Sequence, residues 1–285
     1  MSRALIIGSN SMLGRAVAAQ LRALDHEVIR CARRGEAEVC YDLASLNPPP
    51  DAALGKLDAI FCCAASFADD SWDGCVANAL VNAVAPYRIA QWAQQSGCPH
   101  VLLAGSVSSC AEFAPSSYGL SKAQGEAALQ FACDRIGARF TAVRFPQLCD
   151  DDGLCARHQI WFARIVARAA AGADLRLPAG DQPRNFLHVA DAARALVNAR
   201  ASGVHGPHVL TSPDSHTYRE IAQMAYAAFG AGGRVVDAPE MRPFRPVTYP
   251  PPSESALALI AGERITMPAA IQRIKQRGAA ARFTA

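Results

Sequence analysis

Lysine is scarce in this sequence: among 28 basic residues only three are lysines, Lys56, Lys122 and Lys275. The formal net charge is +3, and no segment combines clustered lysine and arginine with aromatic residues, as a nucleic-acid-binding surface would. The sequence therefore predicts no nucleic-acid partner. Because lysines are so few, a motif that contains one of them is rarely matched by chance.

Long apolar runs are absent as well. No stretch approaches the roughly 20 residues of a membrane span. Residues 1–8 are too few for a signal peptide, so we expect a first strand there, a cytoplasmic protein and no membrane partner. The ten cysteines lack the C-x2-C spacing of zinc and redox sites. We expect them to pack as small hydrophobic residues, with neither a disulfide framework nor a metal site.

Two groups of acidic and histidine residues resemble metal ligands only superficially. The run Asp150–Asp152 is explained by a turn, and His188 with Asp191 by a helix N-cap. The C-terminal segment is locally basic, and we interpret it as a solvated helix face followed by a frayed tail. Its basic residues are Arg264, Arg273, Lys275, Arg277 and Arg282.

Apolar runs alternate with segments of helical periodicity over the first half of the chain, which predicts an α/β fold with a doubly wound parallel sheet of the Rossmann type. The later part is rich in Asp, Gly and Pro turns and predicts a small C-terminal substrate lobe. We expect strands at 3–8, 26–31, 39–43, 57–65, 100–105, 140–145 and 207–211, and helices at 15–24, 78–95, 118–135, 159–171, 191–201 and 218–229. The expected Rossmann domain is 1–146 with 185–212 returning to it, and the expected lobe is 147–184 with 213–285.

The first strand leads through a glycine turn into an amphipathic helix. In a dinucleotide-binding fold such a turn lets the backbone approach a pyrophosphate, while the helix N-terminus supplies unpaired N–H groups. The spacing fits G-x-x-G-x-x-G with serine in the middle position. The expected cofactor-binding residues of this turn are Gly8, Ser9, Asn10, Ser11, Met12, Leu13 and Gly14.

The end of the second strand predicts the choice of cofactor. An acidic residue there would bind the ribose 2′-hydroxyl of NAD, but this chain continues with Arg33 and Arg34, whose guanidinium groups suit a 2′-phosphate. NADP is therefore favoured over NAD. The alternative is that both arginines are simply solvated loop residues.

Tyr118 and Lys122 stand at i and i+4, so both side chains lie on one face if the segment is helical. A tyrosine needs a nearby positive charge to act near neutral pH, and Lys122 can supply it. Ser106 follows an apolar strand and can hold the same substrate oxygen. These three groups would suffice for proton transfer to or from a carbonyl. The alternative has Tyr118 packing a helix on the sheet while Lys122 is solvated.

Taken together, these residues resemble the extended short-chain dehydrogenase/reductase superfamily, also called the NAD-dependent epimerase/dehydratase group. The resemblance covers most of residues 3–201 and implies a catalytic set of Ser106, Tyr118, Lys122 and Asn82, the last supporting the proton relay. It adds cofactor contacts at Asp42, Leu43, Ala64 and Ala65, with Tyr118 and Lys122 also touching the cofactor. Substrate contacts are implied at Ser66, Ser106, Gln147 and Arg184, where Gln147 replaces the usual asparagine and Arg184 matches an arginine that contacts a sugar-nucleotide diphosphate.

The resemblance leads us to expect an NADPH-dependent ketoreductase that acts on a small substrate, a nucleotide-linked keto-deoxysugar. One alternative is a sugar-nucleotide epimerase that retains NAD(P). Another is a noncatalytic NADP sensor or assembly subunit, although such proteins often lose the Tyr/Lys pair. Family members commonly form homodimers through the two helices that would here be 78–95 and 118–135.

Overall fold

The computed structural model describes residues 2–45, 47–50, 54–110 and 115–284. The chain divides into two compact units. Unit 1 contains residues 1–145, 192–210 and 250–262, and unit 2 contains 146–191, 211–249 and 263–285.

Unit 1 is built on a seven-stranded sheet in which every pair of neighbouring strands is parallel. The order β10-β6-β5-β4-β1-β2-β3 reverses direction at β1, as in a doubly wound fold, and confirms the predicted fold class. Its strands are β1 (Arg3–Ile7), β2 (Glu27–Ala32), β3 (Val39–Cys40), β4 (Ala59–Cys62), β5 (His100–Ser106), β6 (Arg139–Phe145) and β10 (Gly206–Val209). All four residues of β4 are buried, because a central parallel strand is covered on both faces.

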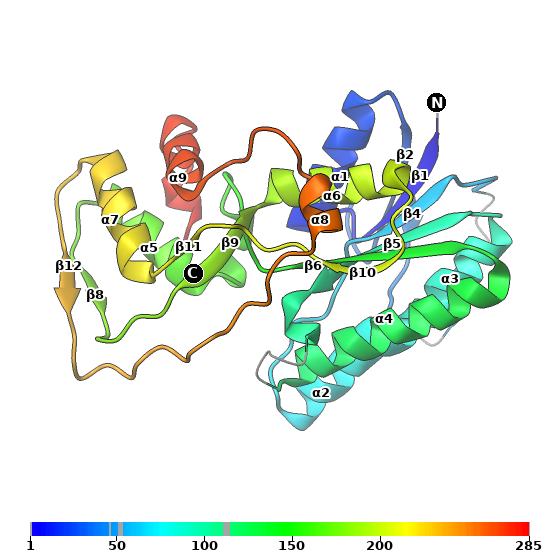
Figure 1. Ribbon diagram of the computed structural model, residues 1–285, viewed down its shortest axis with the longest axis horizontal. Coiled ribbons are helices and arrows are strands. Elements are labelled where there is room, and N and C mark those ends of the chain that lie inside the picture. Colours follow the sequence, from blue (N-terminus) through cyan, green and yellow to red (C-terminus); the bar gives the residue numbers. More distant parts are fainter. Residues whose placement is uncertain (1, 46, 51–53, 111–114, 285) are drawn as a thin grey trace. The chain divides into compact units, whose positions relative to one another are not determined.

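Helices cover both faces of this sheet (Figure 1). The helices α3 and α4 lie on one face, and α1 and α6 on the other. The helices of unit 1 are α1 (Met12–Ala23), α2 (Trp72–Asn78), α3 (Ala85–Gln95), α4 (Ser117–Ile136), α6 (Val189–Ser202) and α8 (Glu254–Ala258). Within the described ranges, no helix is both long and apolar enough to cross a membrane.

The predicted helix 78–95 differs from the structure in one informative way. Between α2 and α3 lies one stretch of π-helix, η1 (Ala79–Val84). Here α4 approaches so closely that a Cβ added at Gly125 would lie 1.8 Å from the carbonyl oxygen of Asn82. Such local widening of a helix is frequent at functional sites, and Asn82 lies within it.

Unit 2 contains two small sheets and three main helices. One sheet has β11 (Ser215–His216), β9 (Arg184–His188) and β7 (Gln147–Cys149), and the other pairs β12 (Val235–Asp237) with β8 (Leu175–Leu177). The helices are α5 (Ile160–Ala170), α7 (Tyr218–Phe229) and α9 (Met267–Gln276). Single 3-10 turns are η2 (Val107–Ser109) in unit 1, and η3 (Leu154–Arg157) and η4 (Ala280–Arg282) in unit 2.

The boundary between the units differs from the expected one at two places. The segment 185–191 was expected to return to the Rossmann domain, but β9 pairs with β7 and β11, so this segment belongs to unit 2. The segment 250–262 was expected in the substrate lobe, but Ser253 donates its backbone N–H to the Val209 carbonyl of β10, which belongs to unit 1.

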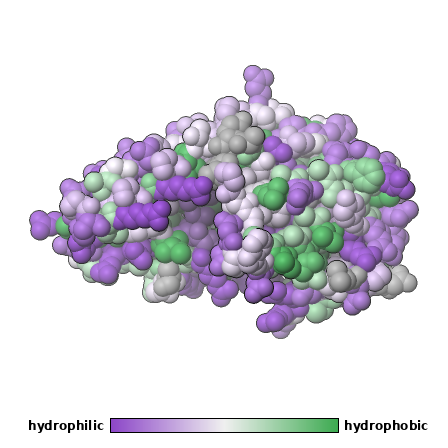
Figure 2. Space-filling view, turned by 90° about the horizontal axis from the view of Figure 1, so that it is seen from below, coloured by the Kyte–Doolittle hydropathy of each residue, from purple (hydrophilic) through white to green (hydrophobic). Residues whose placement is uncertain are grey.

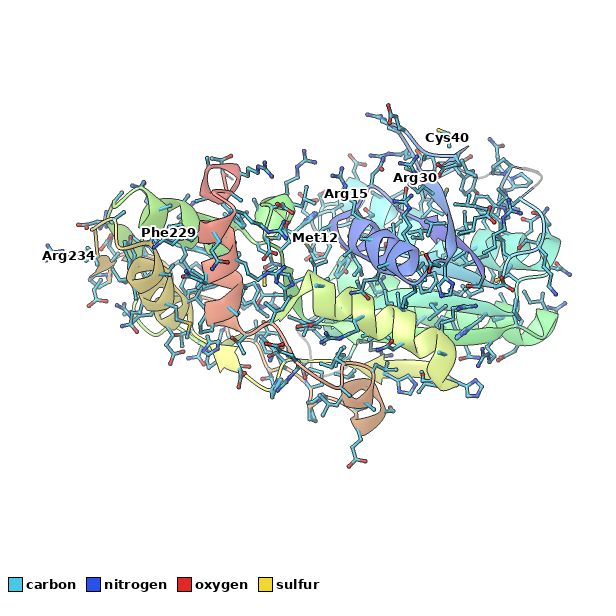
Figure 3. The ribbon with its side chains drawn as sticks, turned by 90° about the horizontal axis from the view of Figure 1, so that it is seen from above. Met12, Arg15, Arg30, Cys40, Phe229 and Arg234 are labelled. Carbon is cyan, nitrogen blue, oxygen red and sulfur yellow. The ribbon has the colours of Figure 1, made fainter. Side chains whose placement is uncertain are left out.

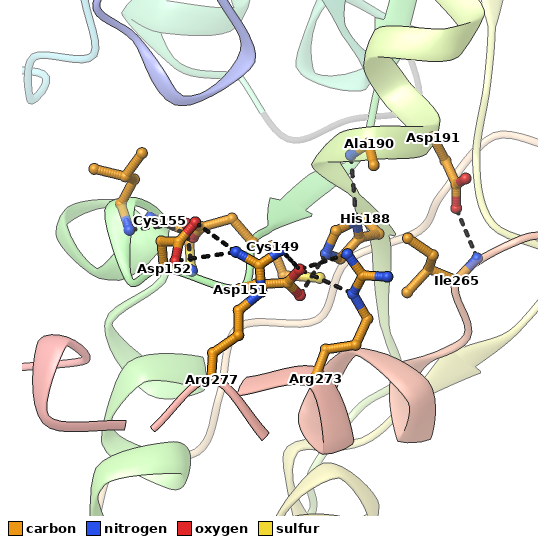
Figure 4. A network of polar contacts seen from close by, with 12 residues as sticks. Cys149, Asp151, Asp152, Cys155, His188, Ala190, Asp191, Ile265, Arg273 and Arg277 are labelled. Atoms are coloured by element: carbon orange, nitrogen blue, oxygen red, sulfur yellow. Dashed lines mark hydrogen bonds and ion pairs between the residues drawn. The ribbon is translucent and has the colours of Figure 1, made fainter. Parts of the chain in front are cut away.

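Most of the basic residues of the C-terminal segment are exposed, as the sequence suggested, but the tail is not frayed, because Phe283 is fully buried and two of the arginines bind a buried carboxylate. The Nε of Arg273 donates to Asp151 at 2.9 Å, and Arg277 lies 3.4 Å from the same carboxylate (Figure 4). His188 lies 2.9 Å from the other oxygen of Asp151. The carboxylate is 5% exposed and therefore needs these partners. The network fixes α9 to β7 and β9 within unit 2.

The turn expected at Asp150 is present. Its carboxylate accepts backbone N–H groups from Asp152, Leu154 and Cys155 at 2.9–3.1 Å. Asp191 accepts the backbone N–H of Ile265. The structure finds no group of three or more potential metal ligands in the part of the chain that it describes.

Candidate active site

The glycine turn after β1 is fixed by two close approaches. Gly8 has a φ of +80°, and a Cβ added there would lie 2.6 Å from the backbone nitrogen of Ala64. A Cβ at Gly14 would lie 2.3 Å from the Gly8 carbonyl oxygen. Ser11, in the middle position of the motif, is the N-cap of α1: its hydroxyl accepts the Gly14 N–H and donates to the Cys63 carbonyl oxygen at 3.2 Å. The turn therefore has room for the serine side chain, and its hydroxyl makes two hydrogen bonds there.

The same turn offers groups suited to an anion. The first turn of α1 supplies the backbone N–H groups of Met12 and Leu13. It contains no acidic residue, so no negative charge there competes with a bound anion. The hydroxyl of Ser9 is buried and finds no hydrogen-bond partner in the described part of the chain. An orphaned hydroxyl at a helix N-terminus fits the pyrophosphate of a dinucleotide. These residues would hold the cofactor there.

Arg33 and Arg34 are exposed immediately after β2, and the backbone of Arg34 is bound to the glycine turn. The Asn10 side chain donates to the Arg34 carbonyl at 2.8 Å, and the Cys40 thiol donates to that of Arg33 at 3.3 Å. Figure 3 shows Arg15, Arg30 and Cys40 along this edge of unit 1. Arg30 is paired with Glu38 and the Nε of Arg15 donates to the Asn10 carbonyl, so Arg33 and Arg34 are the candidates for contact with a 2′-phosphate.

The adenine side of the expected cofactor site consists of Asp42, Leu43, Ala64 and Ala65. Leu43 is buried, while Asp42 is exposed and its carboxylate accepts the Ala44 backbone N–H at 3.0 Å. Ala64 adjoins Gly8, as described above, and Ala65 is exposed after β4. Ala64 and Ala65 follow β4, which pairs with β1, whereas Asp42 and Leu43 follow β3, which pairs with β2. These residues and the glycine turn thus lie beyond the carboxyl ends of parallel strands, where Rossmann folds bind their ligands.

Ser106 ends β5, and Tyr118 and Lys122 lie one turn apart on α4. Ser106 caps η2 by accepting the Ser108 N–H at 3.1 Å, so its hydroxyl proton stays available, and it hydrogen-bonds to Tyr118. The Lys122 ammonium is buried and donates to the carbonyl of Ala104 at 2.7 Å. The structure thus brings the three expected catalytic groups to one end of β5.

The electrostatics of Tyr118 differ from the sequence expectation. Burial raises its pKa to about 12, the Ser106 hydrogen bond opposes that shift and the Glu126 charge adds to it. Lys122 was expected to lower this pKa, but its ammonium is bound to the Ala104 carbonyl. Burial lowers the pKa of Lys122 itself, against the influence of Cys62 and Glu126. The shift of the Tyr118 pKa favours the neutral phenol, which is the form that donates a proton.

Asn82 makes specific contacts, although none of them is with Lys122. Its side-chain oxygen accepts the Ser66 backbone N–H, and its side-chain nitrogen donates to the Ser66 carbonyl, both at 2.9 Å. The same nitrogen donates to the Ser121 hydroxyl at 3.0 Å. Asn82 therefore fixes the segment after β4, which includes Ser66, to α4 beside Tyr118 and Lys122.

The sequence analysis missed Asn78, which repeats this arrangement one helical turn earlier. Its amide binds both backbone groups of Ala68 at 2.9 and 3.1 Å and donates to the Ser117 hydroxyl at 2.9 Å. Asn78 is fully buried. The signal in the sequence was the double i, i+4 spacing of Asn78 with Asn82 and of Ser117 with Ser121.

Phe67, also missed, lies between the two residues that the asparagines bind. Its ring stacks on that of Tyr118 with centroids 3.9 Å apart and planes tilted by 36°. The Phe67 side chain is nevertheless 58% exposed. A large apolar ring held beside the phenol is available to contact the carbon skeleton of a substrate.

Gln147 and Arg184 lie in unit 2 and share a neighbour there. The Gln147 amide donates to Gln159 at 2.7 Å, lies 3.5 Å from the Tyr218 hydroxyl and accepts from Tyr249 at 2.8 Å. The Arg184 guanidinium lies over the rings of Tyr218 and Phe244 and donates to the Arg245 carbonyl at 2.9 Å. Its Nε is buried without a partner among the described residues, so Arg184 can donate to a further hydrogen-bonding group.

Comparison with known proteins places these features in context. A family model described as NAD dependent epimerase/dehydratase family matches residues 4–210. A curated Streptomyces sp protein, dTDP-4-dehydro-6-deoxy-D-allose reductase, is 28% identical over 141 residues, which are 48% of this chain and 42% of that protein. The match thus spans less than half of the relative's length.

Solved structures of similar fold cover nearly the whole chain. The structure of RMD from Pseudomonas aeruginosa complexed with NADPH has a TM-score of 0.82 at 16% identity. The alignment covers 98% of this chain and 99% of the RMD chain. The UDP-glucose 4-epimerase from Thermus thermophilus in complex with NAD has a TM-score of 0.74 at 19% identity and covers 97% and 99%. At such identities the likeness establishes the fold.

Proposed function

Because the chain belongs to the NAD dependent epimerase/dehydratase family, we propose that it is an NADPH-dependent ketoreductase that reduces the carbonyl of a nucleotide-linked keto-deoxysugar. The observation that carries the proposal is the joint placement of Ser106, Tyr118 and Lys122 at the end of β5. The relative named as a reductase of a dTDP-linked keto-deoxysugar supports the substrate class.

The residues divide the chemistry among them. A bound NADPH would supply the hydride for the carbonyl carbon. Tyr118 donates the proton to the carbonyl oxygen, which Ser106 holds and polarises. The Lys122 ammonium, which donates to the Ala104 carbonyl, would hold the cofactor's ribose beside Tyr118. The raised pKa of Tyr118 keeps the proton in place until the oxygen becomes basic.

Arg33 and Arg34 support NADP as the cofactor, and Arg184 supports a substrate with an anionic group, such as a diphosphate. An epimerase that oxidises and re-reduces one carbon is the second candidate, supported by the fold likeness to UDP-glucose 4-epimerase. It would retain its nucleotide through purification and consume no NADPH.

The proposal is tested by following NADPH oxidation with a panel of nucleotide-linked keto-sugars and simple ketones, with NADH compared at equal concentration. We expect turnover with a keto-deoxysugar and a preference for NADPH. Tyr118→Phe should abolish turnover and leave NADPH binding nearly intact. Full activity of Tyr118→Phe, or nucleotide-sugar epimerisation without net NADPH consumption, would contradict the ketoreductase.

A further inference from the structure

Near the catalytic groups lies an ion pair with a buried carboxylate that the mechanism does not use. Glu126 follows Lys122 by one turn on α4 and is 4% exposed. Its Oε2 accepts from both Nε and Nη2 of Arg144 on β6, at 2.8 and 2.7 Å. A buried carboxylate with a two-pronged guanidinium contact has a fixed orientation.

The other oxygen of Glu126 reaches the turn that carries Ser106. The Ser109 hydroxyl lies 3.1 Å from Glu126 Oε1 and 2.7 Å from the Ser106 carbonyl oxygen, so one side chain joins both. Gly105 makes room for this arrangement, because a Cβ added there would lie 2.9 Å from Glu126 Oε1 and 3.1 Å from Arg144. The contact is therefore built into the end of β5.

Arg144 extends the same connection to the residue that follows η2. Its Nη1 donates to the Cys110 sulfur at 3.6 Å. The pair thus joins four places: α4 through Glu126, the Ser106 turn through Ser109, β6 through Arg144 and the end of the turn through Cys110.

We propose that the Glu126–Arg144 pair is a positioning element that fixes the Ser106 turn against α4 and so sets the Ser106 hydroxyl relative to Tyr118. The role rests on the proposed reductase function, since it deepens the account of the same site. Glu126 touches neither substrate nor cofactor; it acts through Ser109 and Arg144. A misplacement of about 1 Å in such a set can cost about 100-fold in rate.

The charge of Glu126 has a second, separable effect. It adds to the burial that raises the pKa of Tyr118. The other titratable groups around this site are Lys122 on α4, Arg144 on β6, Cys110 after η2, and Cys62 and Cys63, whose influence reaches Lys122. Removing the Glu126 charge should therefore lower the pKa of Tyr118 and move the basic limb of the pH–rate profile to lower pH.

Two variants separate positioning from charge. Glu126→Gln removes the ion pair and the charge, while Ser109→Ala removes only the bridging hydroxyl and leaves no buried charge unpaired. In both we expect kcat to fall about 10- to 100-fold, with little change in KM or in the dissociation constant of NADPH. Only Glu126→Gln should shift the pH profile. The matched control is Glu27→Gln, whose carboxylate pairs with Arg3 near the opposite end of β1 and β2.

Hydrogen exchange of residues 106–110 gives a readout that needs no turnover. Exchange there should accelerate in Glu126→Gln and Ser109→Ala but not in Glu27→Gln. If Glu126→Gln does not fold, Ser109→Ala carries the test alone. Wild-type kcat together with wild-type exchange in the folded variants would overturn the positioning role. Failure of the wild-type protein to reduce any carbonyl would refute the proposed function, while the exchange comparison would still decide whether the pair fixes the turn.

Discussion

Asn78 and Asn82 stand one helical turn apart, and each uses its side-chain amide to bind both backbone groups of a single residue. Asn78 binds Ala68, and Asn82 binds Ser66. Each amide also donates to a serine hydroxyl on α4. The segment that holds Phe67 is thereby fixed at two points against the helix that carries Tyr118.

Replacement of Asn78 by alanine should loosen this segment without touching the glycine turn. The lost amide leaves the backbone groups of Ala68 unpaired, which we expect to cost about 2 kcal/mol in the free energy of unfolding. Reductase kcat should also fall, while the NADPH dissociation constant stays the same. Denaturant unfolding and steady-state kinetics measure the two effects. Asn198→Ala, which removes a hydrogen bond to the Leu259 carbonyl in the same unit, should lower stability alone.

Arg33 and Arg34 should determine the discrimination between cofactors. Replacing either by methionine removes one charged contact to a 2′-phosphate, so kcat/KM with NADPH should fall about 10- to 100-fold. The value with NADH should change little, because NAD lacks that phosphate. Arg22→Met, an exposed arginine in the last turn of α1, serves as the control. Equal losses with both cofactors would show that the two arginines do not recognise the phosphate.

His100 should make the stability of unit 1 sensitive to acid. Its Nε2 lies 3.0 Å from the Thr141 hydroxyl, whose proton goes to the Val204 carbonyl, so Nε2 carries a proton and donates it to Thr141. Burial, aided by Arg139 and Arg200, lowers its pKa to about 4. Unfolded histidine titrates near 6.5. The unfolded chain therefore binds a proton first as the pH falls, and stability decreases between about pH 6.5 and 4.

The expected loss from His100 is about 3 kcal/mol over that interval. Unfolding free energies measured from pH 7 to 4 test it. In His100→Gln, which keeps a nitrogen donor for Thr141, this part of the pH dependence should disappear. An identical pH dependence in that variant would assign the effect to other groups.

Asp151 should be the residue on which the attachment of α9 within unit 2 depends most. Burial works against its ionised form, but hydrogen bonds from His188 and Arg273 prevail and lower its pKa to about 2. Its contribution to stability is present above about pH 4 and is lost as the pH falls towards 2. Asp151→Asn should cost about 3 kcal/mol at neutral pH, as measured by chemical denaturation. The matched control is Asp174→Asn, whose carboxylate is 53% exposed beside Arg234.

The helices around η1 expose several large apolar side chains, and we predict that this face is the interface of a homodimer. Trp72 is 89% exposed, Leu120 on α4 is 62% exposed, and Val76, Tyr87 and Phe131 lie on the same set of helices. Figure 2 shows apolar residues gathered on this side of unit 1. Exposed apolar groups of this kind favour association.

Leu120→Glu should therefore shift the protein from dimer to monomer in sedimentation or light-scattering measurements. Leu154→Glu introduces the same change at another exposed leucine, in unit 2, and should leave the oligomeric state unchanged. A monomeric wild-type protein would refute the prediction.

The sheet of unit 1 was largely predictable because its central strands β1, β4 and β5 are buried almost throughout and appear as continuous apolar runs. The helix at 218–229 was also predicted at its observed bounds, since its apolar residues follow a helical period and Gly230 ends it with a φ of +64°. The two small sheets of unit 2 were not. Their strands have two to five residues, too few to show a period, and β9 buries Arg184, Asn185 and His188 together with its apolar residues.

The candidate site was predictable where a local spacing carries the chemistry, as with Tyr118 and Lys122 on one helix face. It was not predictable where the chemistry depends on contacts between elements. Glu126 and Arg144 are 18 residues apart on a helix and a strand, and nothing local pairs them. The direction of the Tyr118 pKa shift was missed for the same reason, because burial and the Ala104 carbonyl determine the local field.

The close packing of Gly8 on Ala64 and the bond from Ser11 to Cys63 have a thermodynamic consequence for ligand binding. Both contacts lie within the protein, so the turn has its binding conformation before any dinucleotide arrives. Little backbone freedom remains to be lost there, and the entropic cost of association falls mainly on the ligand. If the turn binds a dinucleotide as proposed, the folding of the β1–α1 and β4 segments contributes to the affinity at this end of the cofactor.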